Sequence, residues 1–176
     1  MDKTELKVVY GQGPSDVNGL HFQDLALTIN HSGYGMPYTQ TLCGTYERVK
    51  INGLIVVDHG TSSFTDCVFT GTTTGDEYIL WQYAGVMLVE HCTFKASASK
   101  GVVKLYCESS YEARNLVKDC VFLSVTGSKG CAIYASNSNN LEKPIYEMNI
   151  VGNTIPDGVA EYLASGNGLT VVNPVK

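Results

Sequence analysis

Two aspartates and a histidine recur at equivalent places in this sequence, and their types suit acid–base chemistry. Asp66, His91 and Asp119 stand in the stretches TDCVFTG, EHCTFKA and KDCVFLS, each directly before a cysteine and three residues before a phenylalanine. A pair of carboxylates can act as acid and base on a glycosidic bond, with histidine as a further proton carrier. A ladder of solvated charges, in which the histidine relieves repulsion between the aspartates, explains the same residues without catalysis. The spatial arrangement of the three stretches decides between these interpretations.

The cysteines that follow these residues could belong to a metal site, a disulfide framework or a structural repeat. A zinc site needs ligands that converge at about 2.0–2.3 Å from one ion. Cys67, Cys92 and Cys120 are instead separated by 25 and 28 residues, and no two cysteines of the chain lie two to four residues apart. Such spacing is typical of a repeating unit.

Further columns of apolar residues follow the same spacing. Leu25 and Asn153 take the cysteine position in an earlier and a later repeat. The columns three residues before and two residues after that position are Phe22, Phe64, Val89, Val117 and Ile150, and Leu27, Phe69, Phe94, Phe122 and Ile155. A second run of β-branched and aromatic residues precedes each repeat, as in LIVVDHG and YILWQYAG. Two short strands that return after about 25 residues make one coil of a solenoid.

This pattern resembles the right-handed parallel β-helices of the pectate-lyase-like superfamily and of bacteriophage tailspikes and appendages. Their coils carry Asn or Cys, then any residue, then Phe or Ile. We therefore expect an all-β protein, one domain over residues 1–176, formed by a short right-handed parallel β-helix of about five to six coils. Two segments depart from the period: a long loop insertion at 30–48, after the first coil, and a short helix at 158–164 that Asp157 would cap.

Stacked coils place equivalent residues about 4.8 Å apart. The three cysteines then line the interior, with parallel Cα–Cβ vectors that do not suit disulfides. We expect free thiols, no metal and no cofactor, and assembly in a reducing cytosol. The outer carboxylates of the Asp66, His91 and Asp119 column would lie about 10 Å apart, close to the separation that inverting glycosidases use.

Aromatic residues supply a second set of candidate binding residues. Four of them fall on the first strand of successive coils, and two lie in the 30–48 loop, where binding residues often reside. These candidates are Trp81, Tyr83, Tyr106 and Tyr134, and Tyr34 and Tyr38. Outward rings on the strands could stack on sugars, but both phases of YILWQYAG are apolar, and rings that point half inward and fill the coil are the simpler expectation.

Composition narrows the classes of partner. The net charge is −5 and only 16% of residues are charged, so the chain has no basic footprint for nucleic acid. It has no apolar run long enough to span a membrane, and its start, MDKTELKVVYGQG, does not have the pattern of a signal peptide. No phosphate-binding loop or nucleophile motif is present.

The resemblance implies a structural and binding module of a bacteriophage virion fibre, spike or appendage. Such a module would contact a host-surface polysaccharide or another virion protein, form a homotrimer, and reside in a virion assembled in the host cytoplasm. The first expected strand lacks a helix that would cover the core, which also favours association. One alternative is a polysaccharide lyase or glycosidase of the pectate-lyase-like superfamily that uses the Asp66, His91 and Asp119 column. The other is a non-catalytic bacterial surface module, located outside the cell.

Overall fold

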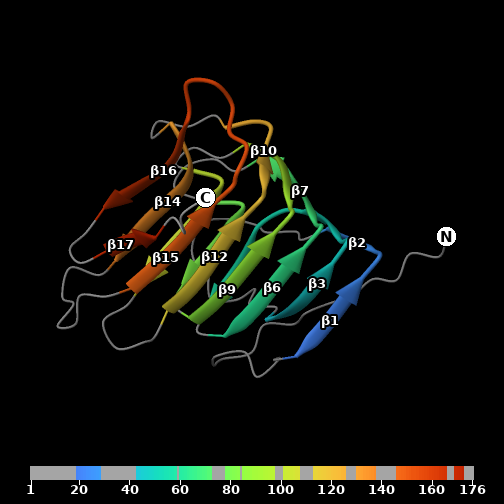
Figure 1. Cartoon of the computed structure of the whole chain (residues 1–176). Coiled ribbons are helices and arrows are strands. Elements are labelled where there is room, and N and C mark those ends of the chain that lie inside the picture. The colour runs from blue at the N-terminus through green and yellow to red at the C-terminus, as the bar shows by residue number, and fades with distance from the viewer. Residues whose placement is uncertain are drawn as a thin grey trace.

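The protein is a parallel β-solenoid of about four turns, consistent with the expected short right-handed β-helix (Figure 1). This computed structural model describes residues 19–28, 43–58, 60–72, 78–83, 85–97, 101–107, 113–125, 130–137, 146–165 and 169–172. Every strand pair between coils is parallel, and successive coils stack in register. The turn count is slightly lower than the five to six coils expected from the sequence.

Three sheets form the walls of the solenoid, and sheet A faces the viewer in Figure 1. Sheet A contains β1 (Leu20–Gln23), β3 (Gly44–Glu47), β6 (Thr61–Thr65), β9 (Gly85–Glu90), β12 (Ala113–Lys118), β15 (Tyr146–Val151) and β17 (Leu169–Val172). Sheet B contains β2 (Ala26–Thr28), β4 (Lys50–Asn52), β7 (Val68–Thr72), β10 (Thr93–Ser97) and β13 (Val121–Phe122). Sheet C contains β5 (Ile55–Asp58), β8 (Leu80–Tyr83), β11 (Val103–Cys107), β14 (Cys131–Asn137) and β16 (Ala160–Ser165). Four coils, which begin at β3, β6, β9 and β12, run in full from sheet A through sheet B to sheet C and give the count of about four turns. Among the described strands, the coils that begin at β1, β15 and β17 are incomplete.

The apolar columns predicted from the sequence form the core. Phe69, Phe94 and Phe122 stack with centroid separations of 4.7 and 4.6 Å. Phe64 is fully buried on the opposite side of the corner. Near-parallel rings at the strand spacing gain both apolar burial and ring contact, so the phenylalanine columns help to fix the register of the coils.

The sequence alignment missed one coil, and the predicted loop insertion at 30–48 is wrong at its carboxyl end. Residues 44–47 form β3, which pairs with β1 and β6. Tyr46 takes the interior place that Phe22 and Phe64 hold in the adjoining coils, with centroid separations of 4.9 and 4.6 Å. Val49 holds the cysteine position. Residues 29–42, which include Tyr34 and Tyr38, lie outside the described residues.

The predicted helix at 158–164 is also wrong. Residues 160–165 form β16, which pairs in parallel with β14, and Asp157 and Gly158 form a turn rather than a helix start. An isolated helix of this length is marginal in water, whereas the free edge of β14 offers backbone partners along the whole segment. Tyr162 also packs against the core from β16. The described residues contain no helix with the length and apolarity needed to cross a membrane.

Candidate functional site

The corner between sheets A and B places the predicted acid–base column on one edge of the solenoid. Asp66, His91 and Asp119 all have left-handed backbone conformations, with φ of 53°, 55° and 51°. Asp24 and Arg48 hold the same place in the first two coils, with φ of 53° and 52°. Aspartate and histidine tolerate this conformation better than most side chains. The backbone turn therefore accounts for the residue types of the column.

Backbone hydrogen bonds continue through this corner. The Asp66 amide donates to the Glu90 carbonyl at 3.2 Å, and the His91 amide donates to the Lys118 carbonyl at 3.1 Å. Each left-handed residue thereby pairs with the next coil, as the strands on either side do. The turn leaves the side chains of Asp66, His91 and Asp119 exposed to solvent.

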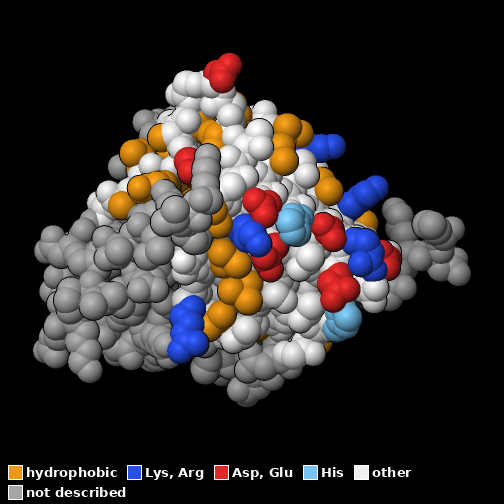
Figure 2. Space-filling view, viewed as in Figure 1, with side chains coloured by type: hydrophobic (Ala, Val, Ile, Leu, Met, Phe, Trp, Pro, Cys, Tyr) orange, Lys and Arg blue, Asp and Glu red, His pale blue; other side chains and the backbone are white. Residues whose placement is uncertain are grey.

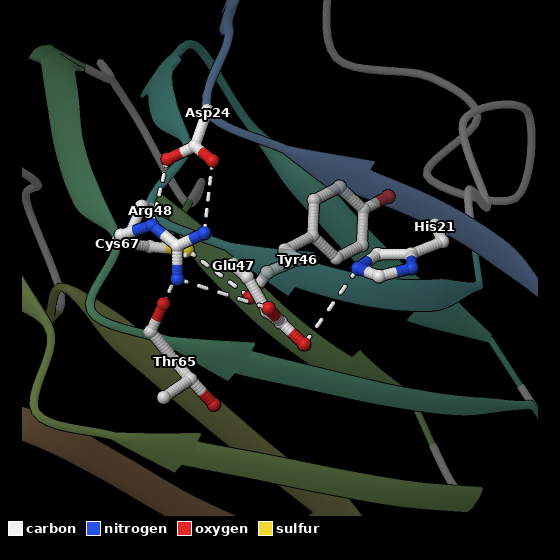
Figure 3. Close-up of polar contacts among 7 residues, drawn as sticks. All are labelled: His21, Asp24, Tyr46, Glu47, Arg48, Thr65 and Cys67. Atoms are coloured by element: carbon white, nitrogen blue, oxygen red, sulfur yellow. Dashed lines mark hydrogen bonds and ion pairs between the residues drawn. The ribbon is translucent and has the colours of Figure 1, made fainter.

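Opposite charges alternate along the amino-terminal part of the corner (Figure 3). Arg48 Nε and Nη2 donate to the two carboxylate oxygens of Asp24 at 2.6 and 2.8 Å, and Arg48 Nη1 lies 3.8 Å from Glu47. Glu47 in turn lies 3.6 Å from His21. The hydrogen bond from Arg48 lowers the pKa of the Asp24 carboxyl, because it favours the ionised form.

The later part of the corner is charged as well. Lys118 Nζ lies 3.7 Å from Glu90 and 3.9 Å from Asp119, and all three side chains are partly exposed. Figure 2 shows acidic, basic and imidazole side chains gathered in a band on this face of the molecule. Among the described residues, no three His, Cys, Asp or Glu side chains form a group that could hold a metal ion. The structure brings Asp66, His91 and Asp119 into one ladder, but a catalytic role for them stays a prediction.

The interior side of the same corner carries the cysteine ladder. Sγ of Cys67, Cys92 and Cys120 donates to a main-chain carbonyl of the preceding coil at 3.4, 3.5 and 3.7 Å. Asn153 replaces cysteine in the last coil, and its Nδ2 donates to the Val117 carbonyl at 3.0 Å. Cys and Asn can therefore replace each other at this position, because both side chains donate to a carbonyl at the corner, a role that Leu25 and Val49 in the first two coils cannot fill.

The three ladder cysteines are buried and free, as predicted. The pKa of the Cys92 thiol is raised by its hydrogen bonds with the thiols of Cys120 and Cys67 and by burial. The hydrogen bond with Cys92 lowers the pKa of Cys67 and of Cys120, while burial acts in the opposite direction. All three side chains pack in the apolar interior as small core residues.

Sheet C presents the aromatic candidates on its outer face. Trp81 pairs in register with Lys104, and Tyr83 pairs with Tyr106 on the same strands. Leu80 and Gln82 alternate with these residues and are fully buried in the interior. The expectation that the rings point half inward and fill the coil is therefore wrong, because alternation along a strand sends the rings to the opposite face.

These rings form a continuous cluster with Tyr134 of β14 and with Tyr78, which precedes β8. The centroids of Tyr83 and Tyr106 lie 4.9 Å apart in a stacked arrangement. Trp81 makes edge contacts with Tyr78 and Tyr83 at 5.8 and 6.1 Å. Trp81, Tyr83, Tyr106 and Tyr134 are each partly exposed. We call these five residues the aromatic surface.

Lys104 lies within the aromatic surface. Its Nζ is 4.2 Å from the ring centroid of Tyr134, 5.5 Å from that of Tyr78 and 5.7 Å from that of Tyr106, distances that permit cation–π attraction. Nζ also donates to the Ser136 hydroxyl. Only 6% of Lys104 is exposed.

Sequence inspection missed Tyr78, Lys104 and Arg48. Lys104 is separated by one residue from Tyr106 in VVKLYCE, so the alternation of the strand could have placed both on one face once the phase was known. Arg48 lies at the end of the segment that the sequence predicts to be a loop, so its place in the corner becomes visible only when β3 is seen to be a strand. Comparisons of the chain with protein-family models, curated proteins and solved structures find no match.

Proposed function

We propose that this protein is a structural and binding module that contacts carbohydrate through the aromatic surface of sheet C. The observation that carries the proposal is the outward row of Trp81, Tyr83, Tyr106 and Tyr134 on a rigid parallel sheet. Aromatic rings offer flat apolar faces, on which the C–H face of a sugar ring can pack, and polar edges. Tyr83 and Tyr106 are one coil apart, and Trp81 and Tyr134 lie two coils apart on either side of Lys104. Rings that are spread over three successive coils suit an extended polymer better than a small molecule.

The rigidity of the support strengthens this proposal. β8, β11 and β14 pair in register over four or five residues, and their inward residues are buried. Side chains on such strands are held in place before a ligand arrives, which lowers the entropic cost of binding. The chain would then serve as a scaffold that recognises its ligand by surface contact.

The biological setting that we propose is a bacteriophage virion fibre, spike or appendage, with a host-surface polysaccharide as ligand. The support for this setting is the resemblance of the coil pattern to that of tailspikes. The same resemblance supports a homotrimer. Sedimentation velocity at micromolar concentration should then report three chains for each particle, and a single monomeric species would contradict this part of the proposal.

A panel of bacterial surface polysaccharides tests the binding proposal. Binding measured by microarray and calorimetry should fall at least about tenfold in the Tyr83→Ala/Tyr106→Ala double variant, since a lost aromatic contact in an interface commonly costs more than 1 kcal/mol. Leu88→Ala is the control, because Leu88 is 37% exposed on sheet A, away from the aromatic surface. Binding that survives the double variant but requires Leu88 would place the ligand elsewhere, and no binding to any glycan would contradict the proposal.

A further inference from the structure

Two amide side chains lie inside the solenoid, where sheet C meets sheet A, and some of their polar atoms have no hydrogen-bond partner in the part of the chain that the structure describes. Gln82 of β8 is fully buried and Asn115 of β12 is 2% exposed. Gln82 Oε1, Asn115 Oδ1 and Asn115 Nδ2 are buried, and none of the described residues offers them a hydrogen bond. A buried amide without partners is costly, and such groups in native proteins are usually met by ordered water.

The positions of the two amides bring them to the same corner. Gln82 Nε2 donates to the Gly85 carbonyl at 2.9 Å and to the Arg114 carbonyl at 3.1 Å, so its amide reaches the residue next to Asn115 in the following coil. Asn115 stacks in register on Met87 and beneath Met148, and all three side chains are buried. The same column also contains the buried Ser62, which pairs with Met87, but the Ser62 hydroxyl accepts a hydrogen bond from the Gly44 amide at 3.2 Å, whereas the Asn115 side chain has no such partner among the described residues.

Exchanging the positions of the oxygen and nitrogen in either side-chain amide does not supply the missing hydrogen bonds. Gln82 Nε2 already makes two bonds to carbonyl oxygens, which fixes its orientation. Both polar atoms of Asn115 lack partners, so either orientation leaves an acceptor and a donor unsatisfied. The group that meets them must both donate and accept.

We propose that the solenoid core binds ordered water between Gln82 and Asn115. Water can donate to Gln82 Oε1 and Asn115 Oδ1 and accept from Asn115 Nδ2, which matches the requirement. A metal cation fits less well, because it cannot accept a hydrogen bond from the amide nitrogen and no carboxylate takes part. The site lies directly behind the aromatic surface, since Gln82 alternates with Trp81 and Tyr83 on β8. Bound water there would fix the strand that carries those rings.

A crystal structure of the full chain at about 1.5 Å resolution tests the proposal. We expect a density peak within about 3.2 Å of Gln82 Oε1 and of at least one polar atom of Asn115. Three results would overturn the proposal. They are a direct hydrogen bond between the two amides, ligand distances short enough for a bound cation, and the absence of any density peak between the two side chains. In solution, the Asn115 side-chain amide protons should show a nuclear Overhauser effect to water, and its absence would count against the site.

Paired leucine variants supply an independent measurement. Asn115→Leu and Met148→Leu place the same side chain in successive coils of one column, so Met148→Leu measures the cost of repacking. With water bound, Asn115→Leu strands Gln82 Oε1 and should lower Tm by about 2–4 °C more than Met148→Leu. If the site is dry, Asn115→Leu removes two unsatisfied atoms and raises Tm relative to Met148→Leu, which would overturn the proposal.

Discussion

Arg48 binds the carboxylate of Asp24, its counterpart in the preceding coil, through two hydrogen bonds of 2.6 and 2.8 Å (Figure 3). Both residues have left-handed backbone conformations, which arginine adopts at a cost of roughly 1–2 kcal/mol. Their pairing therefore offsets part of the strain of the corner and ties the first coil to the second.

The stability that this pair contributes should depend on pH. Arg48 lowers the folded-state pKa of Asp24. The contribution is fully present above the unfolded pKa of about 3.9 and is lost as pH falls through the lower folded value. Thermal unfolding of the native chain and of Asp24→Asn from pH 7 to pH 2 should give two Tm curves that converge at the acid end. A difference in Tm that stays constant from pH 7 to pH 2 would show that the stabilisation does not come from the ionised carboxylate of Asp24.

Salt should weaken the same pair, because both side chains are about half exposed. The gap in Tm between the native chain and Asp24→Asn at pH 7 should narrow between 0.05 and 1 M NaCl, values that span Debye lengths from more than 10 Å to about 3 Å. Lys50→Ala, an exposed change on β4, serves as the control for general salt effects.

Cys92 should tolerate loss of its thiol far better than gain of a charge. Cys92→Ala removes a small buried group and should cost roughly 1–2 kcal/mol of unfolding free energy. Cys92→Asp buries a carboxylate among neighbouring coils and should cost several kcal/mol or abolish folding. Denaturant unfolding compares the two. Rapid labelling of Cys67, Cys92 and Cys120 in the native protein would contradict their interior placement.

Gly152 should resist replacement because it ends the charged corner. Its φ is 72°, and an added Cβ would lie 2.1 Å from Asp119 Oδ1. The carboxylate can swing away, so the backbone strain should dominate, and Gly152→Ala should cost about 1–2 kcal/mol. Gly152→Asn also displaces Asp119 but tolerates the left-handed region better, and it should therefore cost less. Equal losses would assign the effect to the clash with Asp119.

Substitution of Asp66 and of Asp119 tests whether the corner between sheets A and B is catalytic. As an acid–base pair, each would be required, and Asp66→Asn or Asp119→Asn would lower turnover by orders of magnitude while Tm stays nearly constant. We expect no new reducing ends and no unsaturated products from the native chain on acidic or neutral bacterial polysaccharides. Cleavage that either asparagine variant abolishes would replace the binding proposal with a polysaccharide lyase or glycosidase.

The sequence alone determined the solenoid and most of its interior. The columns of Phe64, Phe69 and Phe94 were predictable because a parallel coil repeats the same environment at each step, so the same residue types recur. The left-handed corner was visible in part as Asp66, His91 and Asp119, although the sequence could not reveal that backbone conformation selects those types.

Where a local sequence pattern fits more than one conformation, only the tertiary structure decided which conformation forms. The segment 160–165 has a helical arrangement of apolar residues, but the open edge of β14 supplies backbone partners that make it a strand. The coil formed around β3 was hidden because it has Tyr46 and Val49 where its neighbours have Phe64 and Cys67. The outward direction of Trp81 and the burial of Asn115 depend on the register between coils far apart in sequence. Only the packed structure fixes that register.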